Sequence, residues 1–440
     1  MAEGTTADTT ADIPFRDRLP VYVLLVTSLV SIFGNQLTAI AVPWFVLETT
    51  GSASLTGITA AVTIVPVVIA TFFGGALVDR TSHRTLSVVS DLISAVTVAA
   101  VPLFYHTTGL GFAGLLVLMF VGAIFDAPGS TARQAMIPSL SRRSGIPLEK
   151  INARFGMLYA GTSLFAAPLA GLLIASLGPV NVLLFNAGTF VFSGLVILFL
   201  VPAMERAAPS GESFMTDVRV GLSYVRNHAL IRTIVIAALL INMLFAPIFG
   251  VAIPVYANQE LQSVRALGIM YGGEGLGALA GSFIYKQIAG RIRKRPYLLV
   301  SVLLLSVPLI PLAFSPGLWL STAIVAVIGL GSGMVNPMVG TLLQQTTPEH
   351  LLGRVSGLVR AGAMVATPIG MLLGGTLIAA LTYSGSFLLS AGLMLAIFVA
   401  LVVNRALYTL DAKPEFPAGS PSRPVPAPPS LERERTTLSS

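Results

Sequence analysis

The sequence predicts an all-α membrane protein with twelve transmembrane helices in two six-helix pseudo-repeat halves. Hydrophobic residues make up 54% of the 440 residues and charged residues only 10%, whereas soluble proteins carry about 25% charged residues. The mean hydropathy of +0.84 also indicates that lipid surrounds most of the chain. Apolar stretches of close to 20 residues, the length that spans a bilayer, recur in two groups of six.

The N-terminal segment, residues 1–19, is predicted to be a cytoplasmic tail. It is polar and carries acidic residues before its first arginine, so it lacks the basic start of a cleavable signal peptide. The apolar run from Val21 to Leu47 is too long for the hydrophobic part of such a peptide. We therefore expect a retained first helix.

Hydropathy over windows of about 19 residues places the remaining elements. The first half, residues 20–202, is expected to contain helices over 20–46, 53–78, 85–107, 110–130, 154–178 and 181–202. The second half, residues 228–406, is expected to contain helices over 228–256, 265–288, 296–314, 317–343, 355–381 and 383–405. Residues 203–227 are too highly charged for a span and are predicted to be a cytoplasmic connector. The proline-rich residues 407–440 are predicted to be a disordered cytoplasmic tail.

The positive charges predict the orientation of these spans. Of the 26 lysines and arginines, all but Arg265 fall on the side of the expected spans that carries both termini, Arg133 and Arg360 being counted there. Positive residues accumulate on the cytoplasmic side of membrane proteins, so both termini are expected in the cytoplasm of a multi-pass cell-membrane protein. The charge is then a topology signal facing lipid, and nucleic acid is excluded as a partner.

The two halves resemble each other in sequence. Arg154 and Arg354 are 200 residues apart, as are Pro168 and Pro368. Ala127-Pro128 and Asn336-Pro337 match at an offset of 209 residues. Parallel repeats of this kind are typical of transporters, which build a binding site where the two halves meet.

A short motif between the second and third helices carries a resemblance to a known family. Gly75-Ala-Leu-Val-Asp79-Arg80-Thr-Ser-His83-Arg84 resembles the cytoplasmic signature loop of the major facilitator superfamily, G-x-x-x-D-R-x-G-R-R/K, with Ser82 and His83 departing from it. The resemblance extends over residues 20–405 and implies two six-helix halves that open alternately to each side of the membrane.

The same motif predicts a conformational latch formed by Gly75, Asp79, Arg80, Arg84 and Asp126. Gly75 would allow a neighbouring helix to approach closely, and Asp79 would face the positive N-terminal end of a helix in the other half. Arg80 and Arg84 would tie this carboxylate to Asp126 at the cytoplasmic end of the fourth helix. The alternative is a solvated loop whose basic residues only set the topology.

Small residues and prolines in the fifth and eleventh helices predict a packing or gating role for Pro168, Gly171, Pro368 and Gly370. The pattern resembles the G-P-x-x-G-G element of the antiporter branch of the superfamily, with alanines in place of some glycines. The stretch Asn152-Ala-Arg154 is similar to that of its drug and siderophore exporters. The alternative is that small residues only permit close helix packing.

Polar residues are sparse inside the expected spans, and this favours an apolar cavity with a few polar side chains on its wall. Asn35, Gln36, Asn242, Phe245 and Phe249 lie on helices expected to line a central cavity. Such a cavity suits an amphipathic substrate, because a strongly polar one would need more groups to replace its water. The alternative for each residue is packing or a hydrogen bond between helices.

Glu274 is the predicted proton-coupling residue. It lies nine residues beyond Arg265, roughly 13 Å along a helix axis at 1.5 Å per residue. Acids at such a depth usually face the protein interior and serve a function. The alternative is a protonated glutamic acid that only hydrogen-bonds between helices.

The leading functional hypothesis is a secondary active transporter that exports a hydrophobic or amphipathic small molecule (drug, antibiotic or siderophore) by proton-coupled alternating access. A facilitator or symporter of a small metabolite or lipid is the alternative. A membrane enzyme or receptor is disfavoured, because no nucleophile with a base appears and the four histidines fall in loops or at helix ends. We expect no cofactor, no metal and a monomer whose partners are the substrate, protons and the lipid bilayer.

Overall fold

A computed structural model describes residues 14–203, 214–288, 291 and 293–411. Within these, it describes the backbone but not the side chains of residues 71–80, 163, 214–218, 349–350 and 411. Every regular element in the described residues is a helix.

The first half consists of six long helices. They are α1 (Phe15–Thr50), α2 (Ala53–Arg80), α3 (His83–Thr107), α4 (Phe112–Ser144), α5 (Leu148–Leu177) and α6 (Pro179–Leu200). Their connections are short, as expected for antiparallel neighbours in a bundle. Gly178, with a φ of 83°, joins α5 directly to α6, a backbone conformation that glycine adopts without strain.

The second half contains more interrupted helices. Its elements are α7 (Phe214–Asn227), α8 (Ala229–Pro247), the π-helical turn η1 (Ile248–Ala252), α9 (Ile253–Gln259), α10 (Val264–Ile288), α11 (Lys294–Ser306), α12 (Leu309–Leu312), α13 (Leu318–Thr346), α14 (Glu349–Val403) and the 3-10 helix η2 (Arg405–Asp411). Helices α8, η1 and α9 together form one span, Ala229–Gln259. Thr382, with a φ of 63°, divides α14 into two arms.

These helices confirm the prediction of twelve spans. Ten helices in the described residues are long and apolar enough to cross a membrane. One of them, Leu351–Val403, contains both arms of α14, and α10 is a further helix of 25 residues whose glycines and Glu274 lower its hydropathy. With the arms counted separately and α10 included, two sets of six spans result.

Several predicted boundaries were wrong. Helix α1 begins at Phe15 rather than residue 20, and residues 407–411 of the predicted disordered tail lie in the helix η2, where Leu407 and Leu410 are buried. The predicted connector contains the helix α7. Helix α4 continues to Ser144 although we expected it to end near residue 130. Pro128 lies inside the continuous helix, and in the turn after it the hydroxyls of Ser130 and Thr131 donate to the carbonyl of Ala127 at 2.8 and 3.0 Å. Residues 412–440 lie outside the described residues, so their disorder stays a prediction.

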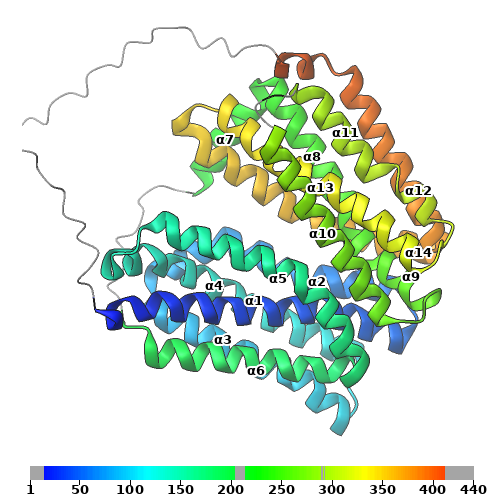
Figure 1. The fold of residues 1–440 in the computed structure, drawn as a ribbon. Coiled ribbons are helices and arrows are strands. Elements are labelled where there is room, and N and C mark those ends of the chain that lie inside the picture. The colour runs from blue at the N-terminus through cyan, green and yellow to red at the C-terminus, as the bar shows by residue number, and fades with distance from the viewer. Residues whose placement is uncertain (1–13, 204–213, 289–290, 292, 412–440) are drawn as a thin grey trace, which may run out of the picture.

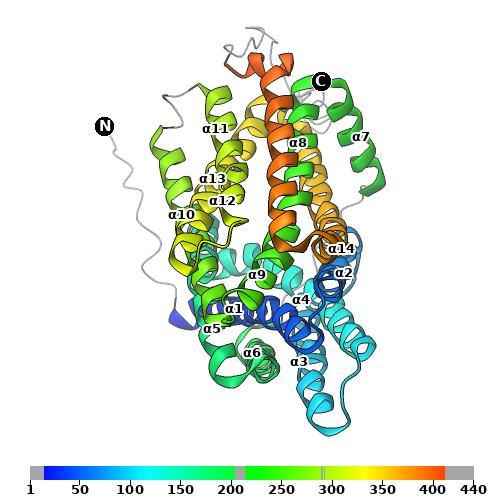
Figure 2. The same ribbon diagram turned by 90° about the vertical axis from the view of Figure 1, so that its right-hand side faces the viewer.

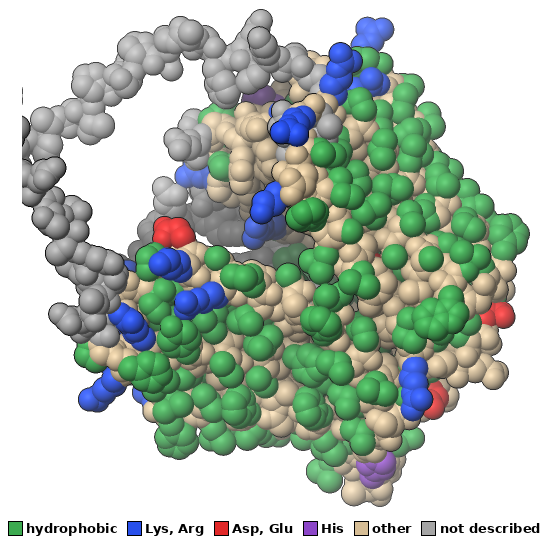
Figure 3. Space-filling model, viewed as in Figure 1, with side chains coloured by type: hydrophobic (Ala, Val, Ile, Leu, Met, Phe, Trp, Pro, Cys, Tyr) green, Lys and Arg blue, Asp and Glu red, His purple; other side chains and the backbone are tan. Residues whose placement is uncertain are grey.

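The two halves converge at one end of the molecule and diverge at the other (Figures 1 and 2). We call the end near α7 and η2 the connector end and the opposite one the far end. Near the far end, the backbones of Gly171 in α5 and Gly268 in α10 touch, and Gly57 in α2 touches Gly375 in α14. Figure 3 shows the surface hollowed between the halves on the side away from these contacts.

The outer surface of the bundle is apolar, as a lipid-facing surface requires. Large hydrophobic side chains such as Phe199, Phe283 and Val399 are exposed, and Figure 3 shows such side chains over both halves. Most of the lysines and arginines visible on this face lie toward the connector end. The largest buried cluster includes Tyr256 and Phe387.

Helices α10 and α13 pack backbone against backbone. A Cβ atom built on Gly277 would lie 1.9 Å from the carbonyl oxygen of Ala326, and one built on Gly329 would lie 2.1 Å from that of Glu274. No side chain fits at these positions, so glycine on both helices sets their separation. This close contact fixes the backbone from which the Glu274 side chain projects.

We predict that Gly329→Ala destabilises the protein. The new methyl group must push α10 away from α13, and overpacking of this kind costs about 1–3 kcal/mol. Gly340 on the same helix is the matched control, since a Cβ there meets nothing within 4 Å and alanine favours helix. Thermal unfolding of the purified variants should show a lower midpoint for Gly329→Ala only. Equal midpoints for the two variants would show that α13 has room to move.

Candidate functional site: two cavities and a buried charge network

The first cavity, of about 330 Å³, lies mainly within the first half. Asn35, Gln36, Thr38, Asp126 and Asn186 are its principal polar residues, and its apolar walls come from α1, α2, α3, α4 and α6. Gly250 and Met371 from the second half also line it. The cavity therefore reaches the contact between the halves, where a change in their relative position would reshape it.

Asp126 occupies a different place from the one predicted. Because α4 continues to Ser144, Asp126 lies near the middle of the helix and not at its cytoplasmic end. One carboxylate oxygen accepts a hydrogen bond from Asn35 Nδ2 at 2.8 Å, and the other lies 3.9 Å from Arg133 Nη2. Asn35 and Asp126 thus form a polar strip on the wall of the first cavity.

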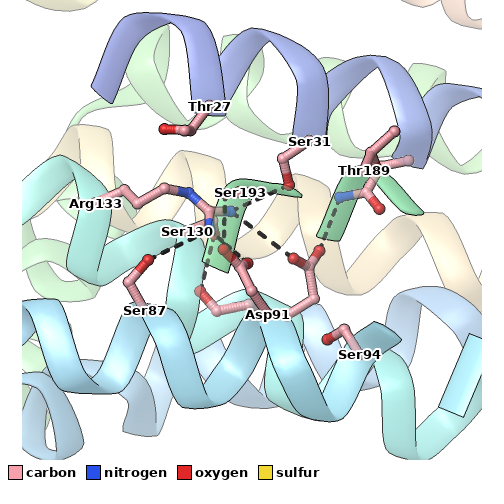
Figure 4. A network of polar contacts seen from close by, with 12 residues as sticks. Thr27, Ser31, Ser87, Asp91, Ser94, Ser130, Arg133, Thr189 and Ser193 are labelled. Carbon is pink, nitrogen blue, oxygen red and sulfur yellow. Dashed lines mark hydrogen bonds and ion pairs between the residues drawn. The ribbon is translucent and has the colours of Figure 1, made fainter. Parts of the chain in front are cut away.

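Arg133 and Asp91 form a buried ion pair beside this strip (Figure 4). Arg133 Nη1 in α4 lies 2.7 Å from Asp91 Oδ1 in α3, and both side chains are buried. The second carboxylate oxygen of Asp91 accepts a hydrogen bond from Ser193 in α6 at 2.7 Å. Arg133 also contacts the hydroxyls of Ser31 in α1 and Ser87 in α3 at 3.4 Å. Arg133 and Asp91 together therefore join four helices of the first half.

The second cavity, of about 400 Å³, lies within the second half. Its polar residues are Asn242 of α8, Glu274 of α10, Ser332 and Asn336 of α13 and Arg360 of α14. Ser332 donates a hydrogen bond of 3.4 Å to Glu274. Phe245 and aliphatic side chains form the rest of the wall. Glu274 thus faces a cavity from within the membrane-spanning region.

Four of the five residues predicted for one central cavity are divided between two cavities. Asn35 and Gln36 line the first cavity, and Asn242 and Phe245 line the second. Phe249 lines neither of them. Its ring stacks on Phe245 with centroids 4.5 Å apart, and its carbonyl accepts a hydrogen bond from the Tyr271 hydroxyl. The separation arises because each set of helices encloses its own space within its half.

The predicted packing residues lie at helix contacts. Pro168 lies against Gly272, and Gly171 against Gly268, so both join α5 to α10 across the two halves. A Cβ on Gly370 would lie 2.1 Å from the carbonyl oxygen of Met243, which brings α14 close to α8. Pro368 lies inside the first arm of α14. A gating role for these four residues stays a prediction.

The latch can be described only in part. Gly75, Asp79 and Arg80 belong to the segment whose side chains lie outside the described residues. We expected Arg84 to pair with Asp126. In this structure Arg84 instead donates to the carbonyl of Leu198 in α6. The halves are apart at the connector end in this structure, whereas the latch is expected to form when that end closes, so the pairing stays a prediction. The role of Asp79 and Arg80 stays a prediction.

Sequence reasoning missed Asp91, Arg133 and Arg360 as interior residues. Asp91 stands alone in an apolar run, which is itself a signal for a functional or paired acid. Arg133 was expected beyond the end of the fourth span, and Arg360, although inside the expected span 355–381, was counted with the cytoplasmic charges; α4 and α14 contain both. The seven-residue spacing from Asp126 to Arg133, two helical turns, could have placed both on one face.

The comparison with protein families agrees with this architecture. The family model described as Major Facilitator Superfamily matches the chain twice, at residues 24–249 and 235–437. The chain belongs to the Major Facilitator Superfamily. Among solved structures, the nucleoside transporter NupG has a TM-score of 0.73 at 12% identity and covers 88% of this chain and 98% of its own. This likeness shows the fold alone.

Curated relatives within the superfamily are exporters by name. The multidrug efflux pump Tap of Mycolicibacterium fortuitum is 33% identical over 402 residues, which is 90% of this chain and 98% of the relative. The pump of the same name from Mycobacterium tuberculosis (strain ATCC 25618 / H37Rv) is 30% identical over 409 residues, with 91% and 96% covered. The enterobactin exporter EntS of Citrobacter koseri is 26% identical over 417 residues, with 89% and 93% covered.

We predict that the Asp91–Arg133 pair is cooperative. Arg133→Gln leaves the Asp91 carboxylate buried with Ser193 as its partner, and breaking a buried pair from one side costs about 3–5 kcal/mol. Asp91→Asn likewise leaves the Arg133 guanidinium buried without the Asp91 carboxylate. The double variant should be less destabilised in thermal unfolding than the sum of the two single variants.

The exposed pair between Arg143 and Asp17, 2.9 Å apart, is the matched control. Asp17→Asn should change the unfolding midpoint little, because surface ion pairs contribute about 0–1 kcal/mol. Strictly additive effects of Asp91→Asn and Arg133→Gln would contradict a direct interaction between the two side chains.

Proposed function

We propose that this protein is a secondary active transporter that exports a hydrophobic or amphipathic small molecule, such as a drug, antibiotic or siderophore, by proton-coupled alternating access. Two kinds of relative support export, because multidrug pumps and a siderophore exporter both match almost the whole chain. The two cavities support an amphipathic substrate, since each has mostly apolar walls with a few polar groups. Contacts near the far end and a hollow toward the connector end suit halves that rock about their interface.

The proposal of proton coupling rests on Glu274, which lies on the wall of the second cavity. Its recorded hydrogen bond comes from Ser332 at 3.4 Å, so its carboxyl group is only weakly fixed. Asp91 is held by Arg133 at 2.7 Å and by Ser193, and Asp126 is bonded to Asn35. A loosely held carboxyl group that faces a cavity can take up a proton from one side and release it to the other.

The alternatives receive less support. A facilitator or symporter of a small polar metabolite would need more hydrogen-bonding groups on its cavity walls, because the substrate loses its water there. Transport rather than catalysis is the activity we propose, with no cofactor and with the protein acting as a monomer. Among the described residues, no group of three or more His, Asp or Glu side chains could hold a metal ion.

The protein is a multi-pass membrane protein, and we propose that its connector end faces the cytoplasm. All lysines and arginines except Arg265, Arg133 and Arg360 lie at that end or in the tails and connector. The lysines and arginines still accumulate on the proposed cytoplasmic side when Arg133 and Arg360 are left out of the count. The hollow between the halves then opens toward the cytoplasm, the side from which an exporter takes its substrate.

We predict that Glu274→Gln abolishes transport driven by a pH gradient but preserves exchange. Inside-out membrane vesicles with an acidic interior should accumulate ethidium, rhodamine 6G or rhodamine B when they contain the wild type. The variant should lose this accumulation, because glutamine cannot carry a proton. Exchange of external dye for internal dye without a gradient should continue at dye concentrations that saturate binding, because exchange needs no net movement of protons.

Glu149→Gln is the control for this experiment. Glu149 is exposed in the first turn of α5, far in sequence from both cavities, and its loss should leave pH-driven accumulation intact. Normal accumulation by Glu274→Gln would remove this residue from the coupling mechanism and would direct attention to Asp126.

The proposed orientation predicts that a reporter fused after Arg405 lies in the cytoplasm. Only a reporter that works in the cytoplasm should therefore be active there. A green fluorescent protein fused there should fluoresce, and alkaline phosphatase at the same position should be inactive. The reverse pattern would place the connector end outside the cell.

A further inference from the structure

We propose that the second cavity recognises zwitterionic amphipathic molecules, with Arg360 binding an acidic group and Glu274 a basic group of the same substrate. This inference rests on the proposed export function and specifies the substrate class. It goes beyond proton coupling at Glu274, because it assigns a function to an arginine that lies on the same cavity wall.

Opposite charges face this cavity without neutralising each other. Arg360 and Glu274 both line the space of about 400 Å³. The ion pairs recorded among the described residues are those of Arg133 and Arg143, and neither Arg360 nor Glu274 takes part in them. Arg360 has no recorded hydrogen bond, and Glu274 has the weak one from Ser332. Both groups are therefore available to a ligand.

Glu274 and Arg360 both lie inside membrane-spanning helices, so setting the membrane topology does not account for these two charges. Glu274 is ten residues from the start of α10 at the far end, and Arg360 is eleven residues from the start of α14 at the connector end. At 1.5 Å per residue, each lies about 15–17 Å along its helix, so both stand within membrane-spanning helices and not in the connections between them. Charges at this depth are costly and usually belong to a substrate or ion pathway.

The remaining polar groups of the cavity suit an organic ligand. Asn336 is exposed in the cavity and has no recorded hydrogen bond, and Asn242 uses its amide nitrogen to bond the carbonyl of Ala238 at 2.8 Å. The Asn242 side-chain oxygen and both ends of Asn336 are left for a ligand. The ring of Phe245 and the aliphatic wall would contact an apolar framework. A volume of this size is within the range of small-molecule sites.

A zwitterion satisfies this cavity better than a purely cationic or neutral compound. A cation alone would pair with Glu274 and leave the Arg360 guanidinium without an anion. A carboxylate on the same molecule can form a charge-assisted, bidentate contact with that guanidinium. The substrate would then neutralise both protein charges at once, and the two charges would also fix its orientation.

Equilibrium binding of two dyes tests this assignment. Rhodamine B carries a carboxylate and a delocalised cation, and its ethyl ester carries the same cation without the carboxylate. We expect the full-length protein in lipid nanodiscs to bind rhodamine B at least about tenfold more tightly than the ester, as measured by fluorescence polarisation. Arg360→Gln should abolish this preference by weakening rhodamine B alone, whereas Glu274→Gln should weaken both dyes.

Two further variants control for folding and for net charge. Arg360→Lys keeps the positive charge and should keep part of the preference, which guards against a misfolded Arg360→Gln protein. Arg405→Gln removes one exposed positive charge from η2 at the connector end and should keep the full preference. Equal affinity of the wild type for the two dyes, failure to bind either, or an unchanged preference in Arg360→Gln would overturn the proposal.

The binding result is independent of the proposed export function. Nanodiscs carry no pH gradient, so a preference for rhodamine B that depends on Arg360 would stand even if vesicles showed no pH-driven transport. Conversely, pH-driven export of ethidium together with equal affinity for the two dyes would support the transporter and refute the zwitterion site. If Arg360→Gln weakens both dyes equally, Arg360 acts on Glu274 or on the fold instead of on the carboxylate.

Discussion

The ion pair between Arg133 and Asp91 is the interaction around which the first half is organised. The hydrocarbon core offers no water, so a charge placed there must either pair within the protein or face a water-filled cavity. Arg133 meets this requirement with Asp91 at 2.7 Å and with the hydroxyls of Ser31 and Ser87, and Ser193 satisfies the other oxygen of Asp91. Because these groups come from α1, α3, α4 and α6, the network holds four helices in one arrangement. Asp126 is left at its edge, on the wall of the first cavity.

The second half follows the same topology with different chemistry. Its helices α10 and α13 approach through glycines that touch the opposite backbone, and its charged residues Glu274 and Arg360 face a cavity without being paired. One half therefore contains a satisfied charge network, and the other contains charges available to a proton or a substrate. Glycine contacts near the far end join the halves, which leaves each half able to move as a unit.

Much of the fold could be predicted from the sequence, because the bilayer dictates the length and apolarity of each span. The twelve helices, the two halves and the superfamily all followed from hydropathy, charge and the Gly75–Arg84 motif. The continuation of α4 to Ser144 could not be predicted, because hydropathy falls where Arg133 enters the helix, and only the folded structure shows the buried partner of Arg133. That error moved Arg133 out of the membrane and Asp126 to a helix end. The division into two cavities could not be predicted either. It depends on how side chains fill the space between helices, and the spacing of residues along the sequence does not show this.

Alternating access by rocking of the two halves is the central claim, and distances between spin labels test it most directly. The chain has no cysteine, so labelled cysteine pairs can be introduced without background. One pair, at Arg142 of α4 and Gln287 of α10, reports on the connector end, and a second, at Ser176 of α5 and Gln262 before α10, reports on the far end. During pH-driven transport, double electron–electron resonance should reveal a population in which the first distance shortens while the second lengthens. Distances that stay fixed, or that change in the same direction at both ends, would contradict the rocking mechanism.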